Sequence, residues 1–508
     1  MATIEDAFLL LVTFRRSTPY LLALASGALQ VAIFPSFRYY ILAPLVLVPL
    51  LVALAAEPDR RKQLLLGTLA GCVFWGGTCY WIYDVMHRYA FLPAPAAAAI
   101  FVGFFAAKGL HSGLFALLAA PLLRRSWAIP GVAAAWVAVE GTHQYIFTWL
   151  HLGNAGISMA TLARLAPWTG VYGLSFALVM MNVAVALVIL RRPRRELAWL
   201  ILLPLLYLLP PVPPREAGTE TVRLIQPNIH PDELLEKRWT RRRASQHLAR
   251  MRALSTEAGS EYEPEHASLL IWPEYPVPAY YFDDPGFEVF MTELARKARA
   301  HVVFNTVSFQ REGEKRYPLN SAVTLDPDGN MISHYSKINL VPFGEFVPWP
   351  FSLFIEEITL QAGGFVPGDT VALAPVGDHW LGTFICYESA FANHVRKFVA
   401  KGANVLINIS NDSWYGRTAA RGQHLSIARM RALENARWLL RATNDGVTAI
   451  IDPGGRVFAP LPSFREGVVS GQFNYSSRMT WFSLYGEWSW WLSIALTCGL
   501  LMLGLWRR

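Results

Sequence analysis

Three residues whose types can act together in nucleophilic chemistry at a carbonyl group each follow an apolar stretch of the chain. Glu274 follows LLIWP, Lys337 follows ISHYS, and Cys386 ends LGTFI. We expect each stretch to be a buried β-strand. Functional sites in layered α/β sheets gather at the carboxyl ends of strands. If the three side chains converge there, the sequence supplies a nucleophile, a base and a cation.

The proposed chemistry assigns one role to each side chain. A free thiol has a pKa of ~8.5 and is mostly protonated at neutral pH, and a neighbouring carboxylate raises that pKa further. Glu274 is therefore interpreted as a base that takes the thiol proton as Cys386 attacks. The ammonium of Lys337 offsets the carboxylate charge and can donate to the oxyanion that forms. The ordinary alternatives are solvated loop residues for Glu274 and Lys337 and a small buried hydrophobe for Cys386.

The composition is that of a membrane protein. Of the 508 residues, 53% are hydrophobic and only 16% are charged, which is too apolar for an ordinary soluble chain. Most of the long apolar runs approach the ~17 to 25 residues that a helix needs to cross a bilayer. The runs are Pro19 to Pro35, Tyr40 to Ala56, Leu64 to Tyr83, Pro95 to Leu123, Ala128 to Phe147, Gly173 to Leu190, Leu197 to Leu209 and Trp490 to Trp506. We predict a membrane α-helical bundle of about eight transmembrane helices, with seven in residues 1–210, a linker at 211–220, a folded domain at 221–480 and a last crossing at 481–508.

Basic residues set the orientation, because loops that keep Lys and Arg near helix ends stay in the cytoplasm. With the N-terminus inside, the cytoplasmic segments hold 13 basic residues, whereas the opposite short loops hold only Arg38, Arg88 and Arg164. The 13 are Arg15, Arg16, Arg60, Arg61, Lys62, Arg124, Arg125, Arg191, Arg192, Arg194, Arg195, Arg507 and Arg508. Both termini are therefore predicted to be cytoplasmic and the domain at 221–480 extracytoplasmic. The net charge of +8 needs no nucleic-acid partner, since these clusters exceed it.

The domain at 221–480 alternates short apolar β-type runs with helical stretches, which is typical of an α/β layered fold. The sequence DPDGN predicts a hairpin turn between two of the strands. Helices are expected at Trp239 to Ala258, Phe287 to Arg299, Phe391 to Ala400 and Ala420 to Leu440. The other cysteines, Cys72, Cys79 and Cys498, lie in apolar runs. Cys386 therefore has no disulfide partner in its domain, although an extracytoplasmic space is oxidising.

Four words of sequence carry a family resemblance: WPEYP at 272–276, YSKINLVPFGEFVP at 335–348, ICYES at 385–389 and NISNDSWYG at 408–416. In this order, and with the apolar runs around them, they resemble apolipoprotein N-acyltransferase, the membrane-embedded branch of the nitrilase superfamily. The resemblance covers nearly the whole chain. It implies a nitrilase-like α-β-β-α sandwich with a Glu-Lys-Cys triad. The positions that match are Glu274, Lys337 and Cys386 for the triad, Glu345 as its support, Tyr387 and Glu388 beside the nucleophile, and Trp239 on the substrate side.

The resemblance also implies a reaction and its partners. An acyl chain passes from a glycerophospholipid to the α-amine of a diacylglyceryl-modified N-terminal cysteine on a lipoprotein, through a thioester on Cys386. A thioester is more reactive toward amines than the starting ester and stays covalently held, so the expected kinetics are ping-pong. The expected location is the bacterial inner membrane, with the catalytic domain on the periplasmic side. We expect no cofactor and a monomeric chain.

A segment after the FGE word is a candidate for contact with lipid. The stretch FVPWPFSLFIEEI at 346–358 carries the apolar residues Phe346, Trp349, Phe351, Leu353 and Phe354. We interpret it as a loop that dips toward the bilayer and gates access, because water competes with the amine and must be kept from the site. The alternative is an apolar segment packed on the domain core.

Three other polar residues need an interpretation. Lys108 and Glu140 lie in apolar runs, where charges are costly and usually paired. We favour a structural ion pair over a role in substrate binding. His424, in RGQHLSIARM, is interpreted as a packing or polar-face histidine rather than a ligand, and we predict no metal.

Two other functions remain as alternatives. A membrane-anchored amidase would use the same three residues but hydrolyse its acyl-enzyme, although one helix would suffice as its anchor. A transporter with an external domain is the other, but the crossings contain no obvious inverted repeat. The signatures HExxH, GxSxG and GxxxxGK[ST] are missing.

Overall fold

The computed structural model describes residues 17–90, 92–213, 217–230, 241–256, 268–275, 277, 279–347 and 364–506. Packing divides these residues into two units, each described here by itself. The helical unit comprises the chain up to Met86, Pro93–Val212 and the chain from Tyr485 onward. The sandwich unit comprises His87–Leu92 and Pro213–Leu484.

The helical unit contains helices of very different lengths. By length and composition, α6 and α10 are the described helices that can cross a membrane alone, and a pair bent by 54° (Arg60–Thr78 with Trp81–Tyr89) is a third candidate. The prediction of about eight crossings is not settled by this finding. The α-helices are α2 (Thr18–Ala32), α3 (Val48–Ala56), α4 (Arg60–Thr78), α5 (Trp81–Asp84), α6 (Ala94–Leu123), α7 (Ala128–Glu140), α8 (Ala160–Ala163), α9 (Ala166–Thr169), α10 (Val171–Ile189) and α17 (Trp488–Trp506).

Two of the apolar runs differ from the uninterrupted helices that hydropathy alone suggests. The run at 40–56 forms a single 3₁₀ turn, Tyr40–Leu42, before α3 begins. The run at 197–209 lies in two 3₁₀ segments, Arg194–Leu202 and Pro204–Leu208. The second segment begins at a proline, which has no backbone N–H to continue the preceding helical hydrogen bonds.

Small residues let α4 and α6 approach closely. A Cβ added to Gly67 would lie 2.4 Å from the carbonyl oxygen of Ser112, and one added to Gly71 would lie 2.5 Å from the Ser112 hydroxyl. On the other helix, a Cβ on Gly113 would lie 2.4 Å from the Thr68 hydroxyl. Glycine is required at these positions because backbone contact replaces side-chain packing, as is common between membrane helices.

The two charged residues of the apolar runs are both buried, but they do not form the direct ion pair that is predicted from the sequence. Lys108 Nζ lies 2.6 Å from Nδ1 of His143 and donates to the carbonyl of Phe147 at 2.9 Å. Glu140 Oε1 instead accepts from the backbone N–H of Leu152 at 2.7 Å. The chain folds back through a 3₁₀ turn at Gly141–Tyr145, which presents His143 to the lysine in place of the carboxylate.

The sandwich unit is built on two sheets. In the described part of the chain, one six-stranded sheet has the order β12-β1-β2-β3-β4-β5 and the other has the order β11-β10-β9-β8-β7-β6. The strands are β1 (Glu220–Gln226), β2 (Leu269–Ile271), β3 (His301–Glu312), β4 (Lys315–Leu325), β5 (Met331–Ser336), β6 (Leu373–Val376), β7 (His379–Ile385), β8 (Val405–Ser410), β9 (Leu439–Thr443), β10 (Thr448–Ile451), β11 (Val457–Leu461) and β12 (Gly467–Phe473).

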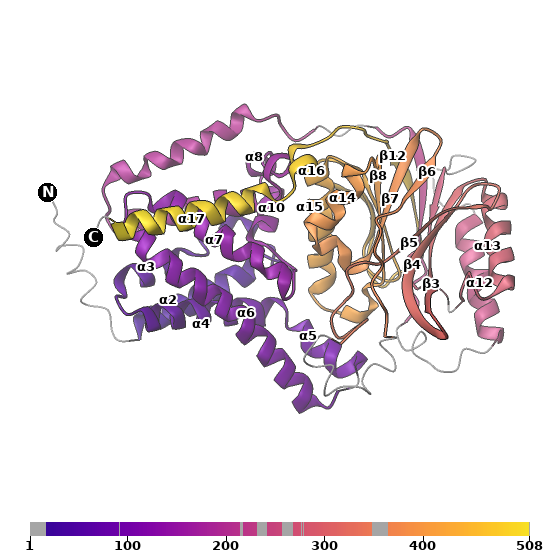
Figure 1. The fold of residues 1–508 in the computed structure, drawn as a ribbon, viewed down its shortest axis with the longest axis horizontal. Coiled ribbons are helices and arrows are strands. Elements are labelled where there is room, and N and C mark those ends of the chain that lie inside the picture. The colour runs from indigo at the N-terminus through magenta and orange to yellow at the C-terminus, as the bar shows by residue number, and fades with distance from the viewer. Residues whose placement is uncertain are drawn as a thin grey trace. The chain divides into compact units, whose positions relative to one another are not determined.

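Helices cover the outer faces of these sheets. Helices α12 (Arg241–Thr256) and α13 (Pro285–Ala298) lie on one side of the strands, and α14 (Ala392–Ala400) and α15 (Ala420–Asn435) lie on the opposite side (Figure 1). A buried apolar cluster joins α12 and α13 to the first sheet through residues such as Met251, Met291 and Phe304. The α/β layers predicted from the sequence are confirmed.

The predicted turn between two strands is found in the structure, but one predicted helix end is not. The predicted hairpin is confirmed. Asp326 begins the turn between β4 and β5, and its side chain accepts from the backbone N–H groups of Asp328 and Asn330. Helix α15 was expected to reach Leu440 but ends at Asn435, because Ala436 adopts a left-handed conformation with φ of 48°. The next residues then enter strand β9.

Strand direction decides which residues can meet. Strand β2 is parallel to β3, and β5 has the same direction as β3 because both are antiparallel to β4. The carboxyl ends of β2 and β5 therefore lie at the same edge of the first sheet. In the second sheet β7 and β8 are parallel, so their carboxyl ends also share an edge.

Candidate active site

The carboxylate of Glu274 is the centre of a buried polar cluster. The residue follows β2 and is only 3% exposed. Its Oε1 accepts from Asn320 Nδ2 at 2.8 Å and lies 3.5 Å from Lys337 Nζ, while Oε2 accepts from the backbone N–H of Asn411 at 2.9 Å. The charge of this carboxylate acts on the buried thiol of Cys386 and raises the pKa of that thiol. Burial raises the pKa of Glu274, and the positive charge of Lys337 offsets this only in part.

Lys337 follows β5 and lies between two carboxylates. Its Nζ donates to Glu345 Oε1 at 2.9 Å and faces Glu274 at 3.5 Å. Burial alone would lower the pKa of Lys337, but the negative charges of Glu345 and Glu274 outweigh burial and raise it. The lysine therefore stays a cation in a site closed to water.

Glu345 is held in turn by its own contacts. Its Oε2 accepts from the backbone N–H of Val341 at 2.8 Å, and its Oε1 accepts from Asn320 Nδ2 at 2.7 Å as well as from Lys337. Asn320 thus donates to both glutamates, and its own Oδ1 accepts from Asn305 at 2.8 Å. This amide fixes the spacing of the two carboxylates.

Cys386 occupies a strained turn between β7 and a 3₁₀ segment, Cys386–Ala390. Its φ of 50° is left-handed, which is uncommon for a residue other than glycine and turns the side chain out of the strand direction. Burial, followed by the negative charge of Glu274, raises the pKa of Cys386, and Lys337 only partly counters this. The group is therefore a thiol at rest, and a base must take its proton for the sulfur to attack.

Glu388 does not touch the other charged groups of the cluster, but it ties together the two segments that carry them. Its Oε1 accepts from the backbone N–H groups of Ile338 and Asn339 at 2.8 and 3.0 Å, directly after Lys337. Its Oε2 accepts from the N–H of Ile385, directly before Cys386, at 2.8 Å. This fully buried carboxylate therefore sets the position of the lysine relative to the thiol.

The remaining predicted residues are placed less centrally. Tyr387 is buried and makes an edge-to-face ring contact with Phe391, 5.2 Å between centroids. Phe346 is partly buried, and its carbonyl accepts from the N–H of Phe343 at 2.7 Å. The predicted positions Trp239, Trp349, Phe351, Leu353 and Phe354 lie outside the described residues.

Sequence reasoning missed two contributors to this cluster. Asn320 lies inside β4 and carries no local signal, because its role depends on the pairing of β4 with β3 and β5. Asn411 does belong to the quoted word NISNDSWYG, and it contributes only its backbone N–H to Glu274. Among the described residues, no group of three or more His, Cys, Asp or Glu side chains is arranged to hold a metal ion.

The arrangement can perform base-assisted nucleophilic attack. A buried thiol lies within electrostatic reach of a carboxylate of raised pKa, and an ammonium lies 3.5 Å from the same carboxylate. Such a base accepts the thiol proton during attack, and the cation can stabilise the negative charge that develops on a carbonyl oxygen.

Known proteins resemble both parts of the chain. Residues 221–481 match the carbon-nitrogen hydrolase family, and residues 26–184 match the apolipoprotein N-acyltransferase N-terminal domain. A solved amidase from Nesterenkonia sp. aligns with 52% of this chain and 93% of its own, at 18% identity and a TM-score of 0.38.

Two curated relatives match over almost their whole length. An apolipoprotein N-acyltransferase from Geobacter metallireducens is 32% identical over 505 residues, which cover 94% of this chain and 93% of the relative. Another, from Pseudomonas syringae pv. tomato, is 32% identical over 509 residues and 95% of both chains. The chain therefore belongs to the apolipoprotein N-acyltransferase family.

Proposed function

We propose that this protein transfers an acyl chain from a glycerophospholipid to the α-amine of a diacylglyceryl-cysteine at the N-terminus of a lipoprotein, with Glu274, Lys337 and Cys386 as its catalytic residues. Membership of the family supports the reaction class. The observation that supports the assignment of residues is the burial of Cys386 within electrostatic reach of Glu274, whose carboxylate also faces Lys337 at 3.5 Å.

In the first half-reaction, Cys386 Sγ attacks the ester carbonyl carbon while its proton passes to Glu274. The tetrahedral oxyanion is stabilised by the charge of Lys337, which Glu345 and Asn320 hold in place. The C–O bond then breaks, and Glu274 returns the proton to the departing oxygen. The products are a lysophospholipid and a thioester on the cysteine.

In the second half-reaction, the α-amine attacks the thioester carbonyl and loses a proton to Glu274. The C–S bond breaks, the proton passes to sulfur, and the product is an amide. Shelter from water is essential because water is a competing nucleophile. The low exposure of Glu274, Lys337 and Cys386, 3%, 1% and 5%, is consistent with that requirement.

The test is to incubate the purified protein with labelled phospholipid and isolate the acylated protein. We expect an adduct that hydroxylamine releases and that Cys386→Ala does not form. Addition of a diacylated lipopeptide should release the acyl chain as an amide faster than water releases it as an acid. Faster release to water would favour an amidase, and absence of any adduct on the parental protein would favour a transporter.

We also propose an inner-membrane protein with about eight crossings, cytoplasmic termini and a periplasmic catalytic domain. The excess of basic residues on one set of loops supports this orientation. Cysteines introduced at Glu314, in the exposed β3–β4 turn, and at Lys62, in the exposed start of α4, probe the two sides. In intact spheroplasts, an impermeant maleimide should label Glu314→Cys and not Lys62→Cys; the reverse pattern would overturn the orientation.

A further inference from the structure

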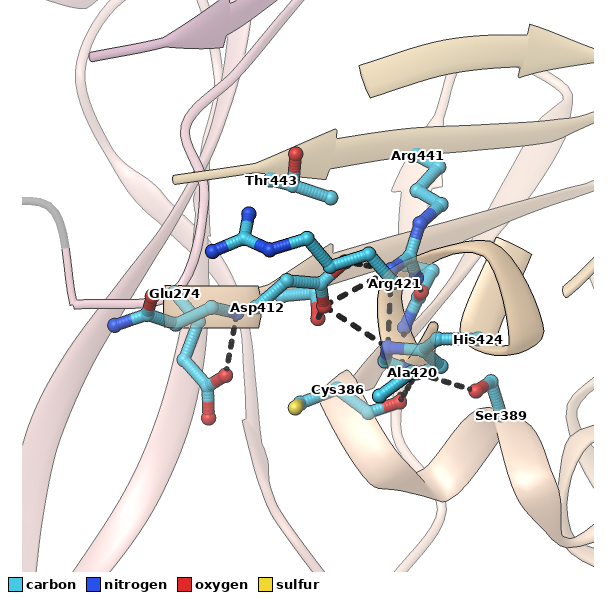
Figure 2. A network of polar contacts seen from close by, with 12 residues as sticks. Glu274, Cys386, Ser389, Asp412, Ala420, Arg421, His424, Arg441 and Thr443 are labelled. Atoms are coloured by element: carbon cyan, nitrogen blue, oxygen red, sulfur yellow. Dashed lines mark hydrogen bonds and ion pairs between the residues drawn. The ribbon is translucent and has the colours of Figure 1, made fainter. Parts of the chain in front are cut away.

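A second polar network lies behind Cys386, on the side away from its sulfur. His424, on α15, is fully buried, and its Nε2 lies 3.2 Å from the carbonyl oxygen of Cys386 and 2.9 Å from Ser389 Oγ. Figure 2 shows the sulfur of Cys386 and its carbonyl oxygen pointing to opposite sides, with the histidine on the carbonyl side. His424 is therefore not placed to take the thiol proton.

The histidine is itself fixed by two charged residues. Its Nδ1 lies 2.9 Å from Asp412 Oδ1 and 3.1 Å from Arg441 Nη2, and Arg441 donates to both oxygens of Asp412 at 3.1 and 2.9 Å. Burial would raise the pKa of Asp412, but Arg441 and His424 hold it below its usual range. Burial and the charge of Arg441 lower the pKa of His424, which keeps the imidazole neutral. An uncharged ring donates to the Cys386 carbonyl only when its proton is on Nε2, and Nδ1 then accepts from Arg441, which Asp412 holds in place.

One short segment links this network to the base as well. The backbone N–H of Asn411 donates to Glu274 Oε2. The next residue, Asp412, supplies the carboxylate that contacts His424 (Figure 2). Ser410, at the end of β8, also donates to Asp412 at 2.9 Å. The end of one strand therefore contacts both the base and, through the imidazole, the turn that carries the thiol.

We propose that His424, oriented by Asp412 and Arg441, is a positioning residue for the nucleophile, which it holds in register with Glu274 through the carbonyl of Cys386. This inference rests on the proposed role of Cys386. A left-handed residue other than glycine is strained, and this conformation persists only when several surrounding contacts hold it. The Cys386 carbonyl has two contacts behind it, His424 Nε2 and, at 3.5 Å, Asn408 Nδ2.

The test compares replacements of one residue by the rate of acyl-adduct formation in single turnover. His424→Gln can place an amide N–H where Nε2 lies, whereas His424→Asn can place one only near Nδ1. We expect His424→Asn and His424→Phe to lower the rate constant for acylation about 100-fold, the cost of a small misplacement of a reacting group. His424→Gln should recover about tenfold of that loss, and the apparent affinity for phospholipid should stay unchanged in all three variants.

Arg431→Met is the matched control. Arg431 is equally buried on the same helix, seven residues beyond His424, and it pairs with Glu434. This variant should lose stability while its acylation rate per folded molecule stays near that of the parental chain. Thermal unfolding in detergent measures the folded fraction for each variant.

The outcomes separate the two proposals. If Cys386→Ala still forms a hydroxylamine-sensitive adduct, the proposed function is wrong. If Cys386→Ala is inert but folded His424→Phe acylates at the parental rate, the positioning role alone is wrong. Equal rates for the Gln and Asn variants would also overturn it, even if the Phe variant does not fold. An unchanged pH dependence in His424→Gln is expected, because a positioning residue does not exchange the reacting proton.

Discussion

Lys337 in the sandwich unit and Lys108 in the helical unit are both almost fully buried, yet the two lysines are satisfied differently. Lys337 donates to one carboxylate at 2.9 Å and faces a second at 3.5 Å. Lys108 lies 2.6 Å from a histidine nitrogen, donates to a backbone carbonyl and places its Nζ 4.1 Å from the centre of the Trp75 ring. Carboxylates are the direct partners of Lys337, whereas Lys108 directly contacts a histidine ring nitrogen, a backbone carbonyl and an aromatic ring.

This difference shows what burial of a lysine requires. Removing a charge from water costs several kcal/mol unless hydrogen bonds and opposite charge replace the solvent. In the sandwich unit the replacement is ionic, which leaves a reactive arrangement of thiol, carboxylate and ammonium. In the helical unit the direct contacts of the lysine are a ring nitrogen, a backbone carbonyl and an aromatic face.

The largest effect should come from Lys337→Met. This change leaves Glu274 and Glu345 buried without a cation, and breaking a buried pair in this way costs about 3–5 kcal/mol of the free energy of unfolding. Acyl-adduct formation should fall below detection. Denaturant unfolding in detergent and the adduct assay measure the two effects.

Lys397→Met is the control for this substitution, because Lys397 is exposed on α14. Its effect on the free energy of unfolding should stay within about 0.5 kcal/mol. A Lys337→Met protein of parental stability would show that the two carboxylates are not charged in the folded state and would remove the contrast with Lys108.

A buried charge can also be held by a histidine together with backbone N–H groups, and Glu388 tests that case. Burial would raise the pKa of Glu388, but His394 and the N–H groups of Ile385 and Asn339 lower it to about 2. Since the folded pKa lies below that of the unfolded chain, the ionised group stabilises the fold above about pH 4.5, and this stabilisation is lost as the pH falls toward 2. Glu388→Gln should therefore lower the free energy of unfolding by about 3 kcal/mol at pH 7.

The pH dependence provides the measurement. The difference between Glu388→Gln and the parental chain should shrink between about pH 5 and pH 2.5 in denaturant unfolding. Glu312→Gln, at an exposed position, should show no such pH-dependent difference. A constant difference for Glu388→Gln across this range would mean that its charge is not what stabilises the turn.

The sequence predicted the layers of the sandwich unit and the neighbourhood of Glu274, Lys337 and Cys386 because both depend on local patterns. Short apolar runs mark buried strands, and residues at the ends of such strands meet wherever the strands share a direction. That these three are catalytic stays a prediction. His424 was interpreted as a packing or polar-face histidine, and it is fully buried, but the pattern could not place it behind Cys386.

The errors concern contacts that no local pattern encodes. Asn320 bridges two glutamates only because β4 pairs with its neighbours in one particular register. The end of α15 depends on Ala436 adopting a left-handed conformation without glycine. In the helical unit, hydropathy marks apolar runs but not the proline at 204 that separates two 3₁₀ segments, and it cannot reveal which residue a turn will bring to Lys108.

The smallest effect, and the sharpest test of the comparison, is a pair of double-mutant cycles on Lys108. Combining Lys108→Met with His143→Phe should give a coupling energy of about 1 kcal/mol or more, because the two side chains are in direct contact. Combining Lys108→Met with Glu140→Gln should give a smaller coupling energy, about 0.5 kcal/mol, because the two residues form no direct ion pair. Denaturant unfolding in detergent gives the free energy of unfolding of all five variants and of the parental chain.

The same variants decide whether this cluster serves structure alone. If it only holds the helices, Lys108→Met should change the folded fraction while the acylation rate per folded molecule and the apparent affinity for phospholipid remain parental. A lower affinity with unchanged stability would instead support a role in substrate binding. A coupling energy between Lys108 and Glu140 as large as that between Lys108 and His143 would show that the carboxylate stabilises the lysine. Both buried lysines would then be stabilised by carboxylates.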